Sequence, residues 1–237
     1  MYSVSGAVAH EFEPDNPIPS VSRLDKSTSG VMVVPTSKVG EIVLTEQFKN
    51  RSVDKTYTAL VRGVTEPHGT IDAKLHVSND KDHFRVYVSP KGKPAVTVYR
   101  RLQLVRLAER AGCSDAPSGH TGKTTDDIFS LLEVKPLTGR THQIRAHFAA
   151  HGHPLVSDTK YKPKVAKKQL RWCPRLFLHA TRIRVRDVEG AVLEADAILP
   201  GDLQEVLKQM EPVETEAVNP VEHTHAVQNV ARDSRPR

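Results

Sequence analysis

The stretch SRLDKSTSGVMVV, Ser22 to Val34, places one acidic residue, Asp25, directly before a run of apolar residues. Two cations flank it, Arg23 and Lys26. The β-branched run Val31 to Val34 predicts a short strand. A carboxylate at the entrance to a strand is most often a turn or capping residue. Taken alone, the stretch favours that structural role for Asp25.

Periodic patterns continue on the C-terminal side of this stretch. Lys38 to Phe48 spaces its apolar residues as an amphipathic helix does, and a second helix is expected from Thr141 to about Gly152. Further strands are expected at Tyr57 to Val61, Phe84 to Val88, Val96 to Val105, Phe129 to Val134, and in a hairpin formed by Ile183 to Val185 and Ala191 to Ile198. Gly201 to Met210 predicts a final helix. This mixture indicates an α+β fold.

Breaks in the pattern suggest the domain organisation. Residues 1–20 are rich in proline without a clear period and are expected to form an irregular N-terminal segment. Residues 106–127 are almost free of apolar residues and predict a flexible insertion. Residues 211–237 predict a disordered tail. One domain is therefore expected at 21–210.

The composition is that of a globular protein with an aliphatic core, because 38% of the 237 residues are hydrophobic but only 5% are aromatic. No apolar run is long enough to span a membrane, and Cys113 and Cys173 have no metal-ligand spacing. Acidic residues near the start argue against an organelle presequence. We expect a cytoplasmic protein with reduced thiols; an organelle is the alternative if the true start lies upstream.

Charge is unevenly distributed along the chain, whose formal net charge is +6. Ten basic residues and no acidic residue lie between Lys160 and Arg186. Such a block is typical of a surface that binds a polyanion such as RNA. A solvated basic loop is the equally weighted alternative.

Two further patterns carry little functional weight. PSGHTGKTT ends like a phosphate-binding loop, but Pro117 stands where that motif requires glycine. A histidine cluster comprises His142, His147, His151 and His153. No carboxylate lies at ligand spacing from it, so a structural or RNA-contacting role is favoured over a metal site.

Three segments gain meaning from their order along the chain. Asp25 lies in SRLDKSTSG, Tyr57 in DKTYTALVRG, and Arg145 in PLTGRTHQIRAH. Each residue has an ordinary structural role when considered alone. Together, and followed by FLHA at Phe177 to Ala180, the segments resemble the signatures of the RluA/RsuA-like pseudouridine synthase family, across Arg23 to about Pro200.

The resemblance implies a fold and an activity. The fold is the pseudouridine synthase catalytic domain, a mixed and mainly antiparallel sheet with flanking helices and a central cleft. The activity is isomerisation of uridine in RNA to pseudouridine. Asp25 matches the essential carboxylate, Tyr57 the ring that packs against the target base, and Arg145 the basic partner of the aspartate. A nearby guanidinium favours the ionised carboxylate, which suits this role.

The resemblance also implies the surroundings and partners of the site. Arg23, Arg140 and His142 are expected to line it. Contacts with the RNA backbone are expected from the basic block, namely Lys160, Lys162, Lys167, Lys168 and Arg171. The reaction is redox-neutral and involves no second substrate, so we expect no cofactor and no metal. RNA is the expected partner of a monomeric protein.

The chain departs from the family pattern before Arg23, where an upstream strand motif is absent, so an N-terminally short member is expected. The alternative function is a non-catalytic RNA-binding or ribosome-assembly protein that keeps the fold. Asp25 favours the enzyme, because a pure RNA binder gains nothing from a carboxylate that faces phosphates. A nucleotide hydrolase built on Gly122-Lys123-Thr124 is the remote third alternative.

Overall fold

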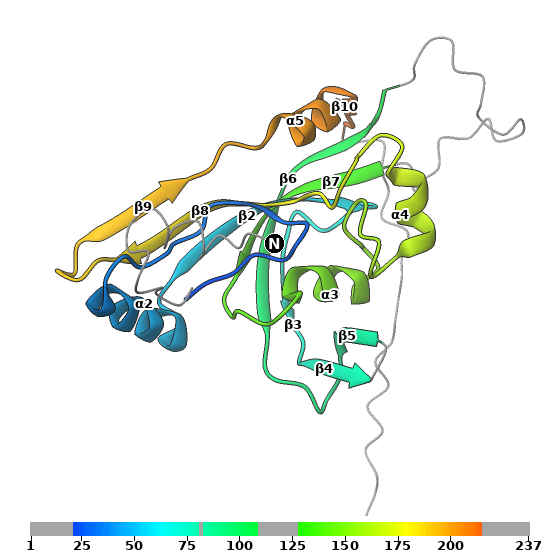
Figure 1. Cartoon of the computed structure of the whole chain (residues 1–237). Coiled ribbons are helices and arrows are strands. Elements are labelled where there is room, and N and C mark those ends of the chain that lie inside the picture. The colour runs from blue at the N-terminus through cyan, green and yellow to red at the C-terminus, as the bar shows by residue number, and fades with distance from the viewer. Residues whose placement is uncertain (1–20, 81–82, 109–127, 215–237) are drawn as a thin grey trace, which may run out of the picture.

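One large sheet forms the centre of the molecule (Figure 1). The computed structural model describes residues 21–80, 83–108 and 128–214. The strands that lie along the sheet follow the order β1-β8-β2-β7-β6-β10, and β3 and β9 extend it by pairing with β6 and β8. Their bounds are β1 Ser29–Gly30, β2 Asp54–Arg62, β3 His68–Asp72, β6 Val96–Leu107, β7 Ile128–Pro136, β8 Leu178–Arg186, β9 Val192–Asp196 and β10 Met210–Pro212.

Strand pairing in this sheet is antiparallel except between β1 and β8, which are parallel. Strands β4 (Leu75–Asp80) and β5 (His83–Val88) form a separate antiparallel hairpin. The helices are α2 Lys38–Asn50, α3 Gln143–Ala150, α4 Pro163–Gln169 and α5 Gly201–Lys208. The predicted α+β fold with a mixed, mainly antiparallel sheet is confirmed.

Alternation along β2 divides the core into two layers. Ala59 and Val61 pack with Phe148 of α3 on one face, whereas Leu60 packs with Leu203 of α5 on the other. Helix α2 covers the far end of the first face through a smaller apolar cluster with β8. In Figure 1, α2 and α3 accordingly lie on the same side of the sheet and α5 on the opposite side. The face between α2 and α3 is left for the site.

The segment that carries Asp25 is attached to the sheet by β1. Gly30 lies opposite Ala180 of β8 and has a φ of 122°, and a side chain at Gly30 would overlap the backbone of Ala180. Glycine is therefore required for this close approach. The strand predicted at Val31 to Val34 is wrong, because pairing ends after the hydrogen bond from Val31 N to Ala180 O. The valines beyond it pack against α2 instead.

Two predicted boundaries are also wrong. The insertion was expected from residue 106, but β6 continues to Leu107. Of the predicted insertion, residues 109–127 lie outside the described residues. The tail was expected from residue 211, but β10 pairs Met210 with Leu107 at the edge of the sheet. The domain therefore reaches beyond 210, and 215–237, like 1–20, lie outside the described residues. Strands β3 and β4 and helix α4 were not predicted.

Across the described ranges, no helix combines the length and the apolar character needed to cross a membrane.

Candidate active site

A cleft of about 400 Å³ opens on the sheet face between α2 and α3. Its walls come from the 21–32 segment, from β2 and β8, and from the loop that leads into α3. The charged and titratable side chains that line it are Arg23, Asp25, Lys55, Tyr57, Arg140, His142, Arg145 and Arg182. Asp25 is the only carboxylate in this lining, which comprises described residues alone.

Asp25 and Arg145 form an ion pair inside the cleft. The Nη1 atom of Arg145 lies 3.2 Å from Oδ2 of Asp25, although 120 residues separate them in the chain. Arg145 is largely buried, with 8% of its surface exposed, in the first turn of α3. The structure thus brings together the two charged residues that the sequence motifs predicted as partners.

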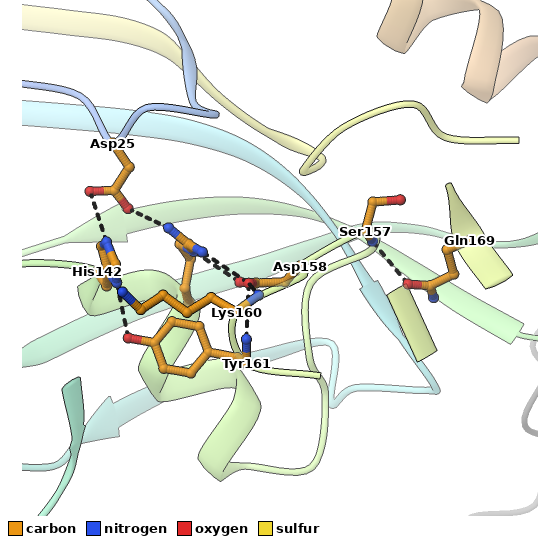
Figure 2. Close-up of polar contacts among 8 residues, drawn as sticks. Asp25, His142, Ser157, Asp158, Lys160, Tyr161 and Gln169 are labelled. Atoms are coloured by element: carbon orange, nitrogen blue, oxygen red, sulfur yellow. Dashed lines mark hydrogen bonds and ion pairs between the residues drawn. The ribbon is translucent and has the colours of Figure 1, made fainter. Parts of the chain in front are cut away.

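A second carboxylate, which the sequence analysis did not assign to the site, holds the other side of Arg145. The Nε and Nη2 atoms of Arg145 each donate a 2.9 Å hydrogen bond to Asp158, which is 1% exposed (Figure 2). Burial disfavours the Arg145 charge, but the hydrogen bonds and charges of Asp158 and Asp25 outweigh it and raise the pKa of Arg145. Arg145 is therefore a fixed cation between two carboxylates.

The backbone around Asp158 is itself ordered by side-chain contacts. Asp158 Oδ1 accepts hydrogen bonds from the backbone N–H groups of Lys160 and Tyr161, at 3.0 and 3.1 Å. Ser157 has a φ of 57°, and its N–H donates to Oε1 of Gln169 in α4 at 2.9 Å (Figure 2). Helix α4 thereby supports the turn that presents Asp158 to Arg145.

His142 completes the polar group around Asp25. Its Nε2 atom lies 3.9 Å from Oδ1 of Asp25, and its Nδ1 atom lies 3.2 Å from the hydroxyl of Tyr161 (Figure 2). Burial lowers the pKa of His142, and the nearby Arg145 and Lys160 charges act in the same direction against the opposing effect of Asp25. The lowered pKa favours the neutral form of His142 at pH 7.

Tyr57 supplies an aromatic ring to the same cleft. It lies in β2 opposite Ala180 and is partly buried. Burial, together with the negative charge of Asp25, raises the pKa of Tyr57 to about 12. The phenol therefore remains neutral across the physiological range, which suits packing against an uncharged base.

The predicted basic block is divided by the fold. The Lys160 ammonium lies 4.5 Å from the centre of the Phe84 ring, which in turn contacts His142 edge to face. The exposed residues Lys162, Lys167, Lys168 and Arg171 belong to α4 and its ends and are not in the cleft lining. Among the later cations of the block, Arg175, Arg182 and Arg184 pair with acidic residues of β9 or α5. The block is therefore not a continuous surface of unpaired cations.

The remaining motifs have structural explanations or lie outside the described residues. His147 is fully buried, with Nδ1 near Oγ1 of Thr97 and Nε2 near the carbonyl of Ala73. His153 Nδ1 contacts the carbonyl of Arg62. The described part of the chain contains no group of three side chains placed to hold a metal ion. The Gly122-Lys123-Thr124 sequence lies outside the described residues.

Comparison with curated proteins gives related sequences. The chain is 38% identical to an uncharacterized RNA pseudouridine synthase of Chloroflexus aurantiacus over 81% of its own length and 53% of that protein. It is 33% identical to ribosomal large subunit pseudouridine synthase D of Escherichia coli over 88% of its own length and 61% of that protein. It is also 34% identical to tRNA pseudouridine synthase C of Haemophilus ducreyi over 68% and 63%. The chain thus spans between one half and two thirds of the length of these relatives.

Solved structures and a family match agree with these sequences. Human RNA pseudouridylate synthase domain containing 1 superposes with a TM-score of 0.64 at 29% identity, over 81% of this chain and 73% of that one. Human RNA pseudouridylate synthase domain containing 4 superposes with a TM-score of 0.63 at 23% identity, over 88% of this chain and 83% of that one, and this likeness supports the fold. The family described as RNA pseudouridylate synthase matches residues 7–150. The chain therefore belongs to the RNA pseudouridylate synthase family, in its RluA-type branch.

Proposed function

We propose that this chain isomerises uridine in RNA to pseudouridine, with Asp25 as the catalytic carboxylate. The observation that carries the proposal is the Asp25 carboxylate in the cleft, ion-paired with an arginine that a second carboxylate fixes in place. The family, and relatives named as pseudouridine synthases, support the same reaction.

The reaction replaces one bond to the ribose with another. The bond between N1 of uracil and C1′ of ribose breaks, the uracil turns, and a bond forms between C5 and C1′. The proton lost from C5 is balanced by the proton gained at N1, so no oxidant, reductant or second substrate is consumed. Whether Asp25 adds to the ribose carbon or accepts a proton, it acts as a carboxylate, and Arg145 holds that carboxylate in the cleft.

The target uridine has to leave its stack before Asp25 can reach it. Enzymes that act on bases extrude the nucleotide and cover it with an aromatic or apolar side chain. Tyr57 lines the same cleft as Asp25 and is suited to this contact as a neutral ring. Arg23 and Arg140 at the cleft, and Lys160 beside it, supply cations for backbone phosphates.

A non-catalytic RNA-binding protein would have no use for this arrangement. A carboxylate in a cleft that receives RNA repels phosphates, so its presence there weakens binding unless it takes part in chemistry. The deeply buried Asp158 has a structural partner on each side, but Asp25 keeps 19% of its side chain exposed toward the cleft. This exposure favours the enzyme over the pure binder.

The test measures pseudouridine in transcripts of large-subunit ribosomal RNA and of transfer RNAs, since relatives named for both match the chain. Transcripts treated with the purified chain are digested to nucleosides and separated by chromatography. Pseudouridine is expected with the natural chain and not with Asp25→Asn, although both bind the transcripts equally. RNA binding without product from the natural chain would instead support the binding role.

A further inference from the structure

Lys55 is a cation in the cleft that has no protein partner among the described residues. It lies in β2, and its side chain lines the cleft beside Tyr57. Within the part of the chain that the structure describes, no carboxylate pairs with its ammonium and no hydrogen bond holds it. Arg145 and Arg182, which line the same cleft, are by contrast each held by two carboxylates. The lack of a partner therefore distinguishes Lys55 from these cations.

The position of Lys55 makes this lack of a partner costly to the free protein. The side chain is partly buried, and burial lowers the pKa of Lys55. A cation removed from water without an anionic partner destabilises the fold. A hydrophobic or neutral side chain at this position would avoid that cost. A ligand that brings an anion to the ammonium would offset it.

The ammonium of Lys55 lies beside the loop that leads into α3. A Cβ atom built on Gly139 would lie 3.8 Å from the Lys55 Nζ atom, and both residues line the cleft. Arg140 follows on the same loop, and its Nε donates to the neutral carbonyl of Pro94 rather than to a carboxylate. Lys55 and Arg140, for which the described ranges supply no carboxylate partner, thus lie at this end of the cleft.

We propose that Lys55 binds a backbone phosphate of the nucleotide that occupies the cleft. This inference rests on the proposed function, which places RNA there. The phosphodiester is the only group in RNA with a full negative charge, whereas a uracil carbonyl supplies only a dipole to a desolvated ammonium. Lys55 and Tyr57 are two residues apart in one strand and on one face, about 7 Å along it. The phosphate therefore lies within one nucleotide of the base that Tyr57 contacts.

The test compares the natural chain with Lys55→Met, Lys55→Arg and the control Lys135→Met. Lys135 lies in the adjacent strand β7 and is exposed outside the cleft lining. Three quantities are measured: the melting temperature without RNA, the salt dependence of binding to a large-subunit ribosomal RNA transcript, and kcat/KM for pseudouridine formation. Lys55→Met should melt at the same or a higher temperature, because it removes an unpaired, partly buried charge.

Loss of one phosphate contact predicts a specific pattern. In Lys55→Met, the slope of log affinity against log salt concentration should decrease by the amount expected for one phosphate contact, which is about one. The value of kcat/KM should fall roughly 10- to 100-fold. Lys55→Arg should keep the slope, and Lys135→Met should match the natural chain in all three measurements. A lower kcat/KM with an unchanged slope would overturn the phosphate assignment in favour of a carbonyl contact.

The remaining outcomes also decide the proposal. A lower melting temperature with unchanged kcat/KM and slope would show that Lys55 serves packing alone and would overturn the inference. If the natural chain makes no pseudouridine, the proposed function fails, but the melting temperature and the salt slope still test the phosphate contact. The two failures are thereby distinguishable.

Discussion

Asp158 accepts two hydrogen bonds of 2.9 Å from Nε and Nη2 of Arg145, and the third guanidinium nitrogen, Nη1, donates to Asp25. A carboxylate and a guanidinium joined through two parallel hydrogen bonds have a defined mutual orientation. The orientation of the Arg145 side chain toward the cleft is therefore set by a residue that the cleft lining does not include.

Replacing Asp158 with asparagine should weaken both stability and turnover. The amide NH₂ would face an N–H donor of Arg145, so Asp25 would be the one carboxylate left to pair with this buried cation. We therefore expect a loss of about 3 kcal/mol in the free energy of unfolding. We expect kcat to fall at least roughly tenfold with little change in KM, because an orienting contact is lost. Denaturant unfolding and steady-state kinetics measure the two effects.

Asp202→Asn is the matched control, because Asp202 also pairs with an arginine, Arg175, through two hydrogen bonds but near the surface. It should cost less than about 1 kcal/mol and leave kcat unchanged. An Asp158→Asn protein with the natural kcat would contradict the orienting role.

Tyr57 should act through its ring and not through its hydroxyl. Because burial and the Asp25 charge raise its pKa to about 12, the phenol stays protonated below pH 10, and Tyr57→Phe should keep kcat/KM within about threefold at pH 7 to 9. Tyr57→Ala should lose roughly 10- to 100-fold through lost contact with the base. Equal losses in both variants would instead assign the function to the hydroxyl.

Gly30→Ala tests how the Asp25 segment is attached to the sheet. The added carbon would overlap the backbone of Ala180, and the φ of 122° is one that alanine rarely adopts. We expect a loss of more than about 2 kcal/mol in unfolding free energy, or a displaced segment with reduced kcat. Gly190→Ala also replaces a glycine with positive φ but meets no atom within 4 Å, so it should cost less. Equal costs would rule out the steric account.

His147 should make the fold sensitive to acid. Burial is the main cause that lowers its pKa below the ordinary value of 6.5, so the unfolded chain binds this proton more readily than the folded one. The resulting stability is present above pH 6.5 and is lost as pH falls from there toward the lowered pKa, by at most about 1.4 kcal/mol per pH unit for one proton.

Urea unfolding between pH 7.5 and 5 measures this effect. His147→Asn should be less stable than the natural chain at pH 7.5, because two buried hydrogen bonds are lost, and its stability should fall less steeply on acidification. Part of the slope should remain, because burial also lowers the pKa of His142 and His151. An unchanged slope in the variant would show that His147 does not titrate in this window.

The sequence predicted the charged centre of the site because its residues lie in ordered motifs. Asp25, Tyr57 and Arg145 were each identified, and the structure places all three in one cleft. Asp158 received no role in the sequence analysis, because an aspartate thirteen residues after an arginine has no periodic relation to it. In the folded chain, Asp158 follows directly on Ser157, which has a φ of 57°, and its carboxylate accepts the hydrogen bond from Arg145 Nε.

The fold was predicted where hydrophobic periodicity is local and missed where pairing is not. Helix α2 and strands β2, β6 and β7 have clear periods, and their positions were correct within a few residues. Strand β10 has three residues with a glutamate in the middle, so its sequence lacks a strand pattern, and its hydrogen bonds come from pairing with β6. In the sequence, the cations of β8 are typical of an RNA-binding surface. In the structure, β9 pairs with β8 and places acidic residues beside Arg182.

Release of tritium from C5 of uridine in a labelled transcript, followed under single-turnover conditions, tests the catalytic role of Asp25 most directly. The C5 proton must leave when the new bond to ribose forms, so the release reports the chemistry separately from binding. The natural chain should release tritium, and Asp25→Asn should be slower by at least roughly 1,000-fold at saturating RNA. Release by Asp25→Asn within about tenfold of the natural rate would contradict the assignment of Asp25 as the catalytic carboxylate.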